Sequence, residues 1–400
     1  MVRTVGTVAR GIRLPIIKAG DDLVKMVIRA IILSAKTEGY LLRDQDVIGV
    51  TESAVARAQG NYVSIDEVAV DVSRKIKGTE ELGILFPILS RNRFSQILKS
   101  IARSAKKIYL QLAYPADEVG NHLMCLEKMY ELGLNPYLDV LSEARYRELF
   151  GQAVKHPFTG IDYVQMYREL VAGEGAEIEV FLANDPRFIL QKTKNVLVAN
   201  VHNRQRHKRV LKQFDPQIVL GLDDLCTTPL KNGSGYNPEY GLLGSNRATK
   251  TKIKLFPREG EKFVQAVQEG LQRETGKQIE VLIYGDGAFK DPVGGIWELA
   301  DPVVAPAYTK GLRGLPNEIK LKYLADNQLQ DLNEEACQKA IKEYIREKKV
   351  DLVGEAVSQG TTPRQLTDLL GSLCDLISGS GDKGTPVVLI QGYFDNYATE

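Results

Sequence analysis

Short apolar runs and amphipathic helical patterns alternate at the N-terminal end of the chain. Residues 5–14 predict a strand, and residues 46–51 predict a second, buried strand. Between them, apolar residues recur at helical spacing from Leu23 to Ile31, behind a pair of aspartates that can cap a helix. A further helix is expected from about residue 52 to Gly60, because glycine is a typical helix end.

The pattern changes between residues 81 and 225. Short apolar strands now alternate with helical segments, which is typical of βαβ units and a parallel sheet. The expected strands are 107–113, 178–182, 196–201 and 218–222, and the expected helices are 116–132, 186–191 and 203–214. We therefore predict a Rossmann-like α/β domain inserted at this place in the chain.

The last unit, residues 226–400, contains a glycine-rich linker at 232–238. The expected elements are strands at 249–256 and 278–284, helices at 261–275 and 333–349, and a helix that begins after Thr362-Pro363. The fold class is thus predicted to be α/β with mixed sheets. Its three parts are 1–80, 81–225 and 226–400, of which the middle part is the insertion.

Composition and charge exclude several classes of function. Lys and Arg (52) almost balance Asp and Glu (51), so no overall field would hold nucleic acid or a membrane surface. The longest apolar segment, 26–35, contains Arg29 and is too short to span a bilayer. The four cysteines are far apart and form no CxxC pair, which argues against a zinc site or a disulfide framework. Without a signal-peptide pattern, a cytoplasmic protein is expected.

A loop of small residues near the end of the chain is the strongest chemical signal. Residues 378–386 include three glycines and run into the apolar strand 387–392. Such a backbone can turn its N–H groups toward an anion, most often a phosphate. We therefore predict a phosphate site in this glycine loop.

Two carboxylate positions could bind a divalent cation. Asp286 lies between two glycines at the end of the strand 278–284, where a carboxylate can hold a metal ion against phosphates. The alternative is an Asp-Gly turn without a ligand. Asp223-Asp224 also ends a predicted strand, and its alternative role is a helix or turn cap.

Two basic features also have two interpretations each. Lys250, Lys252 and Lys254 alternate along an expected strand and therefore share one of its faces. They either line an anionic pocket or, more commonly, solvate an edge strand. Arg57 lies one turn into its helix and either reaches bound phosphates or is simply exposed. The basic run 202–209 lacks an interleaved aromatic residue and is expected to be a solvated surface.

Four ordered segments resemble motifs of the coenzyme F420-0:γ-glutamyl ligase family. They are RLPIIKAGDDL (13–23), DVIGVTESAVARAQG (46–60), TGKQIEVLIYGDG (275–287) and LISGSGDKGTPVVLIQG (376–392). The resemblance covers roughly residues 1–75 and 240–395. The middle of the chain looks like an insertion that standard members lack.

The resemblance implies a GTP-dependent ligase that activates a carboxylate as an acyl phosphate and joins it to an amino acid such as L-glutamate. It implies Mg²⁺ or Mn²⁺, small-molecule substrates and an intertwined homodimer. By resemblance, the residues that contact the nucleotide are Leu14, Pro15, Ile16, Ile17, Glu52, Ser53, Arg57, Asn246, Ser378, Gly379, Ser380, Gly381, Asp382, Lys383 and Gly384. Asp286 would be the metal carboxylate, with Asp382 as a substitute ligand.

Two metal ligands of the family are replaced in this chain. Leu243 stands where the family motif NAGxDxSN has its aspartate, and Ser380 stands where the glycine loop has a glutamate. Leucine offers no oxygen donor to a cation. The alternative hypothesis is therefore a non-catalytic or altered-substrate relative that acts as a ligand-binding or regulatory protein. A third hypothesis is that the inserted domain carries an activity of its own.

Overall fold

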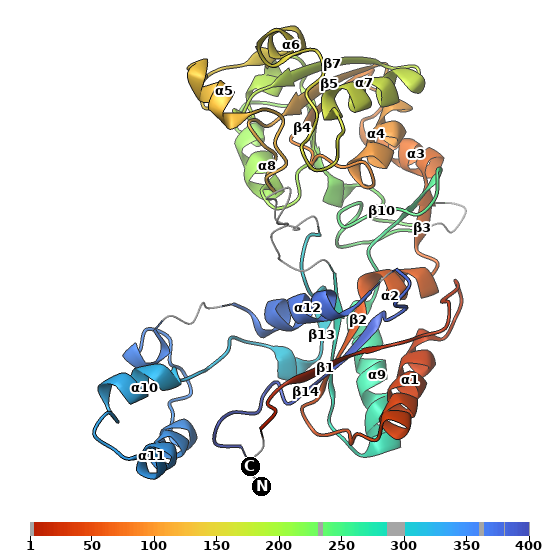
Figure 1. The fold of residues 1–400 in the computed structure, drawn as a ribbon. Coiled ribbons are helices and arrows are strands. Elements are labelled where there is room, and N and C mark those ends of the chain that lie inside the picture. Colours follow the sequence, from red (N-terminus) through yellow and green to blue (C-terminus); the bar gives the residue numbers. More distant parts are fainter. Residues whose placement is uncertain (1–3, 231–234, 286–300, 360–363, 380, 400) are drawn as a thin grey trace.

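The computed structural model describes residues 4–230, 235–285, 301–359, 364–379 and 381–399. Figure 1 shows a lower body and an upper body joined by a narrower region, with a small helical unit projecting from the lower body. Each body is built around one large sheet, and a third, smaller sheet lies between them. The predicted α/β fold class with mixed sheets is confirmed.

The sheet of the lower body combines strands from both ends of the chain. Its order is β1-β14-β2-β12-β13. The strands are β1 (Val8–Ile12), β14 (Val387–Gln391), β2 (Val47–Thr51), β12 (Glu280–Tyr284) and β13 (Ala307–Tyr308). β14 runs antiparallel to both β1 and β2, whereas β2 and β12 are parallel. The central strands are buried on both faces, which explains their continuous apolar runs.

Helices cover both faces of this sheet. α1 (Leu23–Glu38) and α9 (Gly260–Thr275) pack on one face, and α12 (Leu366–Ile377) packs on the other. The side chain of Asp22 caps α1, as the sequence pattern predicts. Gly39 ends the helix in a left-handed conformation. The short helix α2 (Glu52–Ala58) follows β2 directly.

The upper body contains a largely parallel sheet of order β6-β7-β5-β4-β8-β9. Its strands are β4 (Glu81–Leu85), β5 (Lys107–Leu112), β6 (Leu141–Ser142), β7 (Glu177–Leu182), β8 (Asn195–Val198) and β9 (Ile218–Gly221). The helices and 3₁₀ turns that accompany it are α4 (Phe94–Ala102), α5 (Leu126–Glu131), α6 (Glu143–Phe150), α7 (Tyr163–Gly173), η1 (Phe188–Gln191), α8 (Arg204–Lys212) and η2 (Leu222–Asp224). Among the described strands of this sheet, β6 alone, at one edge, is antiparallel to its neighbour.

A small sheet of order β10-β11-β3 lies between the bodies. It consists of β3 (Tyr62–Ser64), β10 (Asn246–Arg247) and β11 (Lys252–Lys254), and β3 leads into α3 (Ile65–Lys75). Apolar residues of α3 and of the segment 242–255 belong to the same hydrophobic core as β4 and β5. The predicted domain boundaries near residues 80 and 225 stay a prediction.

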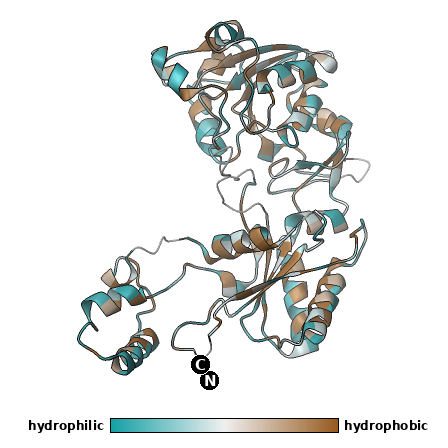
Figure 2. Ribbon diagram, viewed as in Figure 1, coloured by the Kyte–Doolittle hydropathy of each residue, from teal (hydrophilic) through white to brown (hydrophobic). Residues whose placement is uncertain are grey.

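The projecting unit contains α10 (Leu321–Asn327) and α11 (Glu334–Arg346) and has a small core of its own. Two 3₁₀ turns, η3 (Lys310–Leu312) and η4 (Ala356–Ser358), flank it. Figure 2 shows hydrophobic residues concentrated along the strands of the lower sheet and on α12. Among the described helices, none combines the length and the apolar character needed to span a bilayer.

Two predicted elements are wrong. The helix expected over 116–132 is limited to α5, because the Asp117 carboxylate accepts N–H groups of Val119 and Asn121 and folds this stretch into a turn. The strand expected over 249–256 is shortened to β11, because the Thr249 hydroxyl accepts the N–H group of Lys252. Residues 232–234 of the expected linker and the pair Thr362-Pro363 lie outside the described residues.

We predict that Gly49→Ala destabilises the lower body. A Cβ atom at Gly49, in the middle of β2, would lie 2.3 Å from Cys374 Sγ on α12 and 3.1 Å from Tyr284 Cδ1. Such overpacking should lower the free energy of unfolding by about 1–3 kcal/mol. The control is Gly173→Ala at the end of α7, where nothing lies within 4 Å of the added atom. Denaturant unfolding measures both variants, and equal stabilities would contradict the packing of α12 on β2.

Candidate functional site

Segments from distant parts of the sequence meet at one edge of the lower sheet, which we call the junction edge. β1, β2 and β12 end there, and β14 begins there. The N–H group of Leu14 donates to the Gly384 carbonyl at 3.2 Å, and that of Thr51 donates to Pro386 at 3.0 Å. The Leu-Pro bend that follows β1 (residues 14–17), the start of α2 and the glycine loop (residues 378–386) are therefore direct neighbours. This edge faces the upper body (Figure 1).

The Leu-Pro bend is held against α2. Arg57 Nε donates to the Ile17 carbonyl at 2.5 Å, and Ile17 itself is buried. Ile16, in contrast, is 81% exposed, and Pro15 and Ser53 are also exposed. Arg57 thus fixes the shape of the bend, whether or not it also contacts a ligand.

The glycine loop is closed at its base by a bridge between Gly379 and Thr385. Its tip, from Gly381 to Gly384, is exposed, and Gly384 has a φ of 63°, which favours glycine. The Thr385 hydroxyl is buried and has no hydrogen-bond partner among the described residues. Ser380 lies outside the described residues. Asp382 is exposed at the tip.

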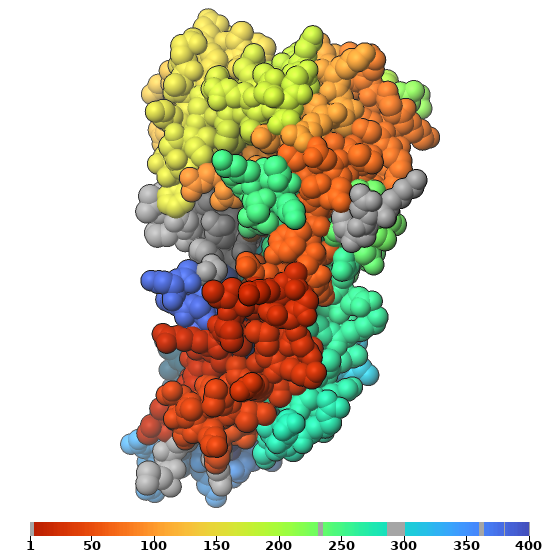
Figure 3. Space-filling model, turned by 90° about the vertical axis from the view of Figure 1, so that its right-hand side faces the viewer, coloured from red at the N-terminus to blue at the C-terminus, as the bar shows by residue number. Residues whose placement is uncertain are grey.

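A groove of about 1200 Å³ runs beside the bend and the loop. Four cationic side chains line it, namely Arg10, Arg13, Arg29 and Lys383. Arg10 donates to Gln391 Oε1 at 2.8 Å and stacks on Tyr40. Figure 3 shows a face of the molecule on which the N-terminal residues (red) form much of the surface of the lower body. A groove with this charge favours an anionic ligand.

Four charged side chains gather where the junction edge meets the upper body, and we call them the junction cluster. Lys254 of β11 forms an ion pair with Glu52, the first residue of α2. Arg93, just before α4, pairs with Asp301 at 2.5 Å. The two pairs influence each other, because both Asp301 and Arg93 act on the Glu52 carboxylate electrostatically. All four side chains are largely buried.

Glu52 is an unusual carboxylate. Burial raises the pKa of Glu52 to about 7, although Lys254 opposes this shift. Its Oε2 atom is buried and has no hydrogen-bond partner among the described residues. Leaving a buried polar atom without a hydrogen-bond partner lowers the stability of the folded protein. A carboxylate with a pKa near neutrality is typical of functional sites. Asn246, from the resemblance, pairs with Lys254 across β10 and β11 and so lies next to this cluster.

The described residues do not form a metal site. No group of three or more His, Cys, Asp or Glu side chains that could hold a metal ion occurs among them. Asp286 lies outside the described residues. Leu243 is 1% exposed and belongs to the core of the upper body, beside a cavity of about 30 Å³. Leu243 therefore has a packing role in this chain.

Other sequence candidates have structural roles here. Asp224 accepts the N–H group of Gly221 at 2.6 Å and pairs with Lys208, and Asp223 pairs with Arg204 at 2.9 Å. This is the arrangement of a turn cap.

Lys250, Lys252 and Lys254 were interpreted as lysines that solvate an edge strand. This interpretation is wrong, because β11, which contains Lys252 and Lys254, is the central strand of its sheet.

Sequence reasoning missed the cluster itself. No sequence pattern singles out Arg93 or Asp301, and none identifies the partner of Lys254. A signal was nevertheless present, because Lys254 lies within a run of apolar residues, Ile253, Leu255 and Phe256, all of which are buried. A lysine within such a run indicates a buried charge.

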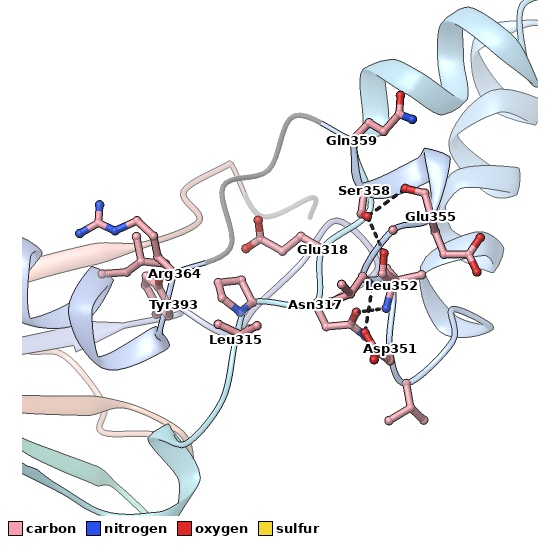
Figure 4. Close-up of a pocket in the computed structure, with 15 residues that line it drawn as sticks. Leu315, Asn317, Glu318, Asp351, Leu352, Glu355, Ser358, Gln359, Arg364 and Tyr393 are labelled. Atoms are coloured by element: carbon pink, nitrogen blue, oxygen red, sulfur yellow. Dashed lines mark hydrogen bonds between the residues drawn. The ribbon is translucent and has the colours of Figure 1, made fainter.

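A second large groove, of about 1180 Å³, lies between the projecting unit and the lower body. Figure 4 shows Arg364 and Tyr393 on one wall and Ser358, Leu352 and Asn317 on the other. The Ser358 hydroxyl donates to the Leu352 carbonyl at 2.6 Å, which closes a turn of that wall. None of the predicted site residues lines this groove.

We predict that Lys254→Met lowers the free energy of unfolding by about 3–5 kcal/mol at pH 8, because Glu52 is left buried without its counter-ion. The folded-state pKa of Glu52 lies above its unfolded value, so the folded state binds more protons and stability falls as pH rises between the two values. Removing Lys254 raises the folded-state pKa further and extends this decline to higher pH.

The double variant Glu52→Gln/Lys254→Met should be more stable at pH 8 than Lys254→Met alone. Urea unfolding at pH 5 and pH 8 measures both, and Lys252→Met, at an exposed position of the same strand, is the control. A double variant that is as unstable as the single one would show that the two side chains are not coupled.

The family model for F420-0:gamma-glutamyl ligase matches residues 11–392. The match runs from β1 to the residue after β14, so it includes every segment of the junction edge as well as residues 81–225. A search of curated proteins finds no match to the chain. Because the matched range spans nearly the whole sequence, the predicted resemblance is confirmed, and the chain belongs to the F420-0:gamma-glutamyl ligase family.

Proposed function

We propose that the protein is a nucleotide-dependent ligase that joins a carboxylate to the amino group of an amino acid through an acyl phosphate. Family membership supports ligase activity in general. The specific proposal is supported above all by the meeting of the Leu-Pro bend, the start of α2 and the glycine loop at one edge. By resemblance, GTP is the expected nucleotide and L-glutamate the expected amino donor.

The proposed reaction has two steps. First, a carboxylate oxygen of the acceptor attacks the γ-phosphorus, the bond to the β-phosphate oxygen breaks, and the nucleoside diphosphate leaves. Then the amine nitrogen attacks the acyl carbon, the bond to the phosphate oxygen breaks, and inorganic phosphate leaves as the amine loses a proton. Both steps depend on orienting the reactants and on stabilising negative charge on phosphate oxygens.

The residues of the junction edge suit these tasks. The backbone of the glycine loop and Lys383 would bind the phosphates, with Arg13 and Arg29 adding positive charge along the groove. Glu52 is a suitable acceptor for the proton of the amine, because its pKa is raised to about 7. A deazaflavin-linked carboxylate as acceptor, a homodimer and a cytoplasmic location stay predictions.

One observation favours a second candidate function. Leu243 is packed into the core of the upper body at the position of a family metal ligand. A relative that binds the nucleotide without turnover, as a ligand-binding or regulatory protein, would tolerate this replacement.

The proposal predicts that the protein, supplied with GTP, Mg²⁺ or Mn²⁺, coenzyme F420-0 and L-glutamate, forms GDP, phosphate and the amide product. Mass spectrometry detects the amide, and omission of each reactant is the control. Bound nucleotide without product would favour the second candidate. Neither binding nor product, with GTP or with ATP, would contradict the proposal.

We also predict that Lys383→Met weakens GTP binding by about 10- to 100-fold, because a charge-assisted hydrogen bond to phosphate is lost. Isothermal titration calorimetry measures the affinity. The matched control is Lys277→Met, which removes a lysine that precedes β12, at the opposite end of the sheet. Equal affinities of the two variants would exclude the glycine loop as the phosphate site.

A further inference from the structure

We propose that the free edge of β1 binds an extended acidic segment of a partner protein, which pairs with β1 as an additional strand of the lower sheet. The segment would lie in the groove of about 1200 Å³ described above, which we call the β1 groove. This inference goes beyond the proposed function and does not depend on it, because it concerns the binding of a peptide chain in the absence of nucleotide.

The first observation is that β1 is an edge strand. It stands at the end of the order of its sheet and pairs with β14 on one side, and no other described strand pairs with it. In an antiparallel pair, alternate residues direct their N–H and C=O groups to opposite edges of the strand. Half of these groups of β1 therefore point away from β14. Such an edge is a template for the addition of a strand.

The second observation is that the β1 groove surrounds this edge. Residues 10–13 line it from β1 and the residue that follows, and residues between 26 and 38 line it from α1. Ile377, Lys383 and Thr385 form the opposite wall, at the end of α12 and in the glycine loop. Because α1 and α12 cover opposite faces of the sheet, the groove lies where the next strand would lie. The α1 wall is about 18 Å long, which matches about five or six residues of strand.

The third observation is the charge of the β1 groove. The four cationic side chains named above line it, and Glu38 is the single acid among its described lining residues. Apart from Arg10, which bonds to Gln391, these cations have no described partner. Arg29 lies on the α1 wall and Lys383 on the opposite wall. The complementary strand therefore carries carboxylates on both of its faces.

The fourth observation is a buried hydroxyl that faces the groove. Thr385 lines the β1 groove and is buried, and its hydroxyl has no hydrogen-bond partner among the described residues. Gly11 lies beside it, because a Cβ atom at Gly11 would be 3.1 Å from Thr385 Cβ. A glycine within a strand often marks the close approach of another backbone. A peptide in the groove would therefore supply the missing partner of the hydroxyl.

The charge of the groove also argues against a second copy of β1 as the occupant. Pairing of two β1 edges would bring Arg10 and Arg13 of both copies together, and like charges on adjacent strands are destabilising. The apolar part of the lining, Met26, Leu33 and Ile377, favours apolar residues between the acidic ones. We therefore expect a segment that combines both kinds of residue.

The test is the binding of a fluorescein-labelled, capped peptide of sequence Glu-Glu-Val-Val-Glu-Glu to the nucleotide-free full chain, measured by fluorescence anisotropy. We expect saturable binding with a Kd of about 100 μM or tighter. Two versions of the peptide, N-methylated at the odd or at the even residues, keep all charges but lose backbone donors. The version that cannot pair with β1 should bind at least about tenfold more weakly than the other.

The matched protein variants lie on α1. Arg29→Met should weaken binding of the unmodified peptide by about tenfold, because a charge-assisted hydrogen bond is lost. Lys36→Met removes an exposed lysine of the same helix that does not line the groove, and it should bind like the wild type. Hydrogen exchange should show protection of residues 8–12 when the peptide is added.

Three results would overturn the inference. They are the absence of saturable binding up to about 1 mM peptide, equal binding of the two N-methylated peptides, and equal affinities of Arg29→Met and Lys36→Met. A free chain that is dimeric, with residues 8–12 already protected from exchange, would assign the edge to a second copy and also overturn it. The proposed function would stand in each case, because product formation tests it separately.

Discussion

The pairing of β14 with both β1 and β2 is the constraint on which the rest of the structure depends. It joins residues near the two ends of the chain in one register, with Val387 opposite both Ile12 and Val50. This register places the glycine loop, which precedes β14, beside the bend that follows β1 and the helix that follows β2. A slip of one residue would move every side chain of β14 to the opposite face of the sheet, against a different set of covering helices. Packing on both faces therefore fixes the register and with it the geometry of the site.

The upper body is attached to this edge by packing and by charge. The segment 242–255 contributes apolar residues to the upper core and also carries Lys254, which pairs with Glu52 of the lower body. Arg93 and Asp301 form a second link of the same kind. Buried ion pairs contribute little net stability but are costly to break. They therefore favour one relative placement of the two bodies.

Much of the fold follows from local sequence signals, whereas the junction cluster does not. The continuous apolar runs of β2, β12 and β14 and the cap of α1 at Asp22 are properties of short segments, and the sequence predicts them. Asp117 shows the limit of periodicity, because one side chain that bonds to nearby N–H groups replaces an expected helix by a turn. The partners Glu52 and Lys254 are 202 positions apart, and Arg93 and Asp301 are 208 apart. Pairings of this kind are fixed by tertiary packing and leave no local pattern.

The most direct test of the proposed site is the position of the nucleotide in a crystal structure of the protein with a non-hydrolysable GTP analogue. We expect the phosphates to lie within hydrogen-bonding distance of the backbone of residues 378–384 and of Lys383 Nζ. Phosphates bound in the groove beside the projecting unit, or at the sheet of the upper body, would contradict the assignment of the junction edge as the nucleotide site.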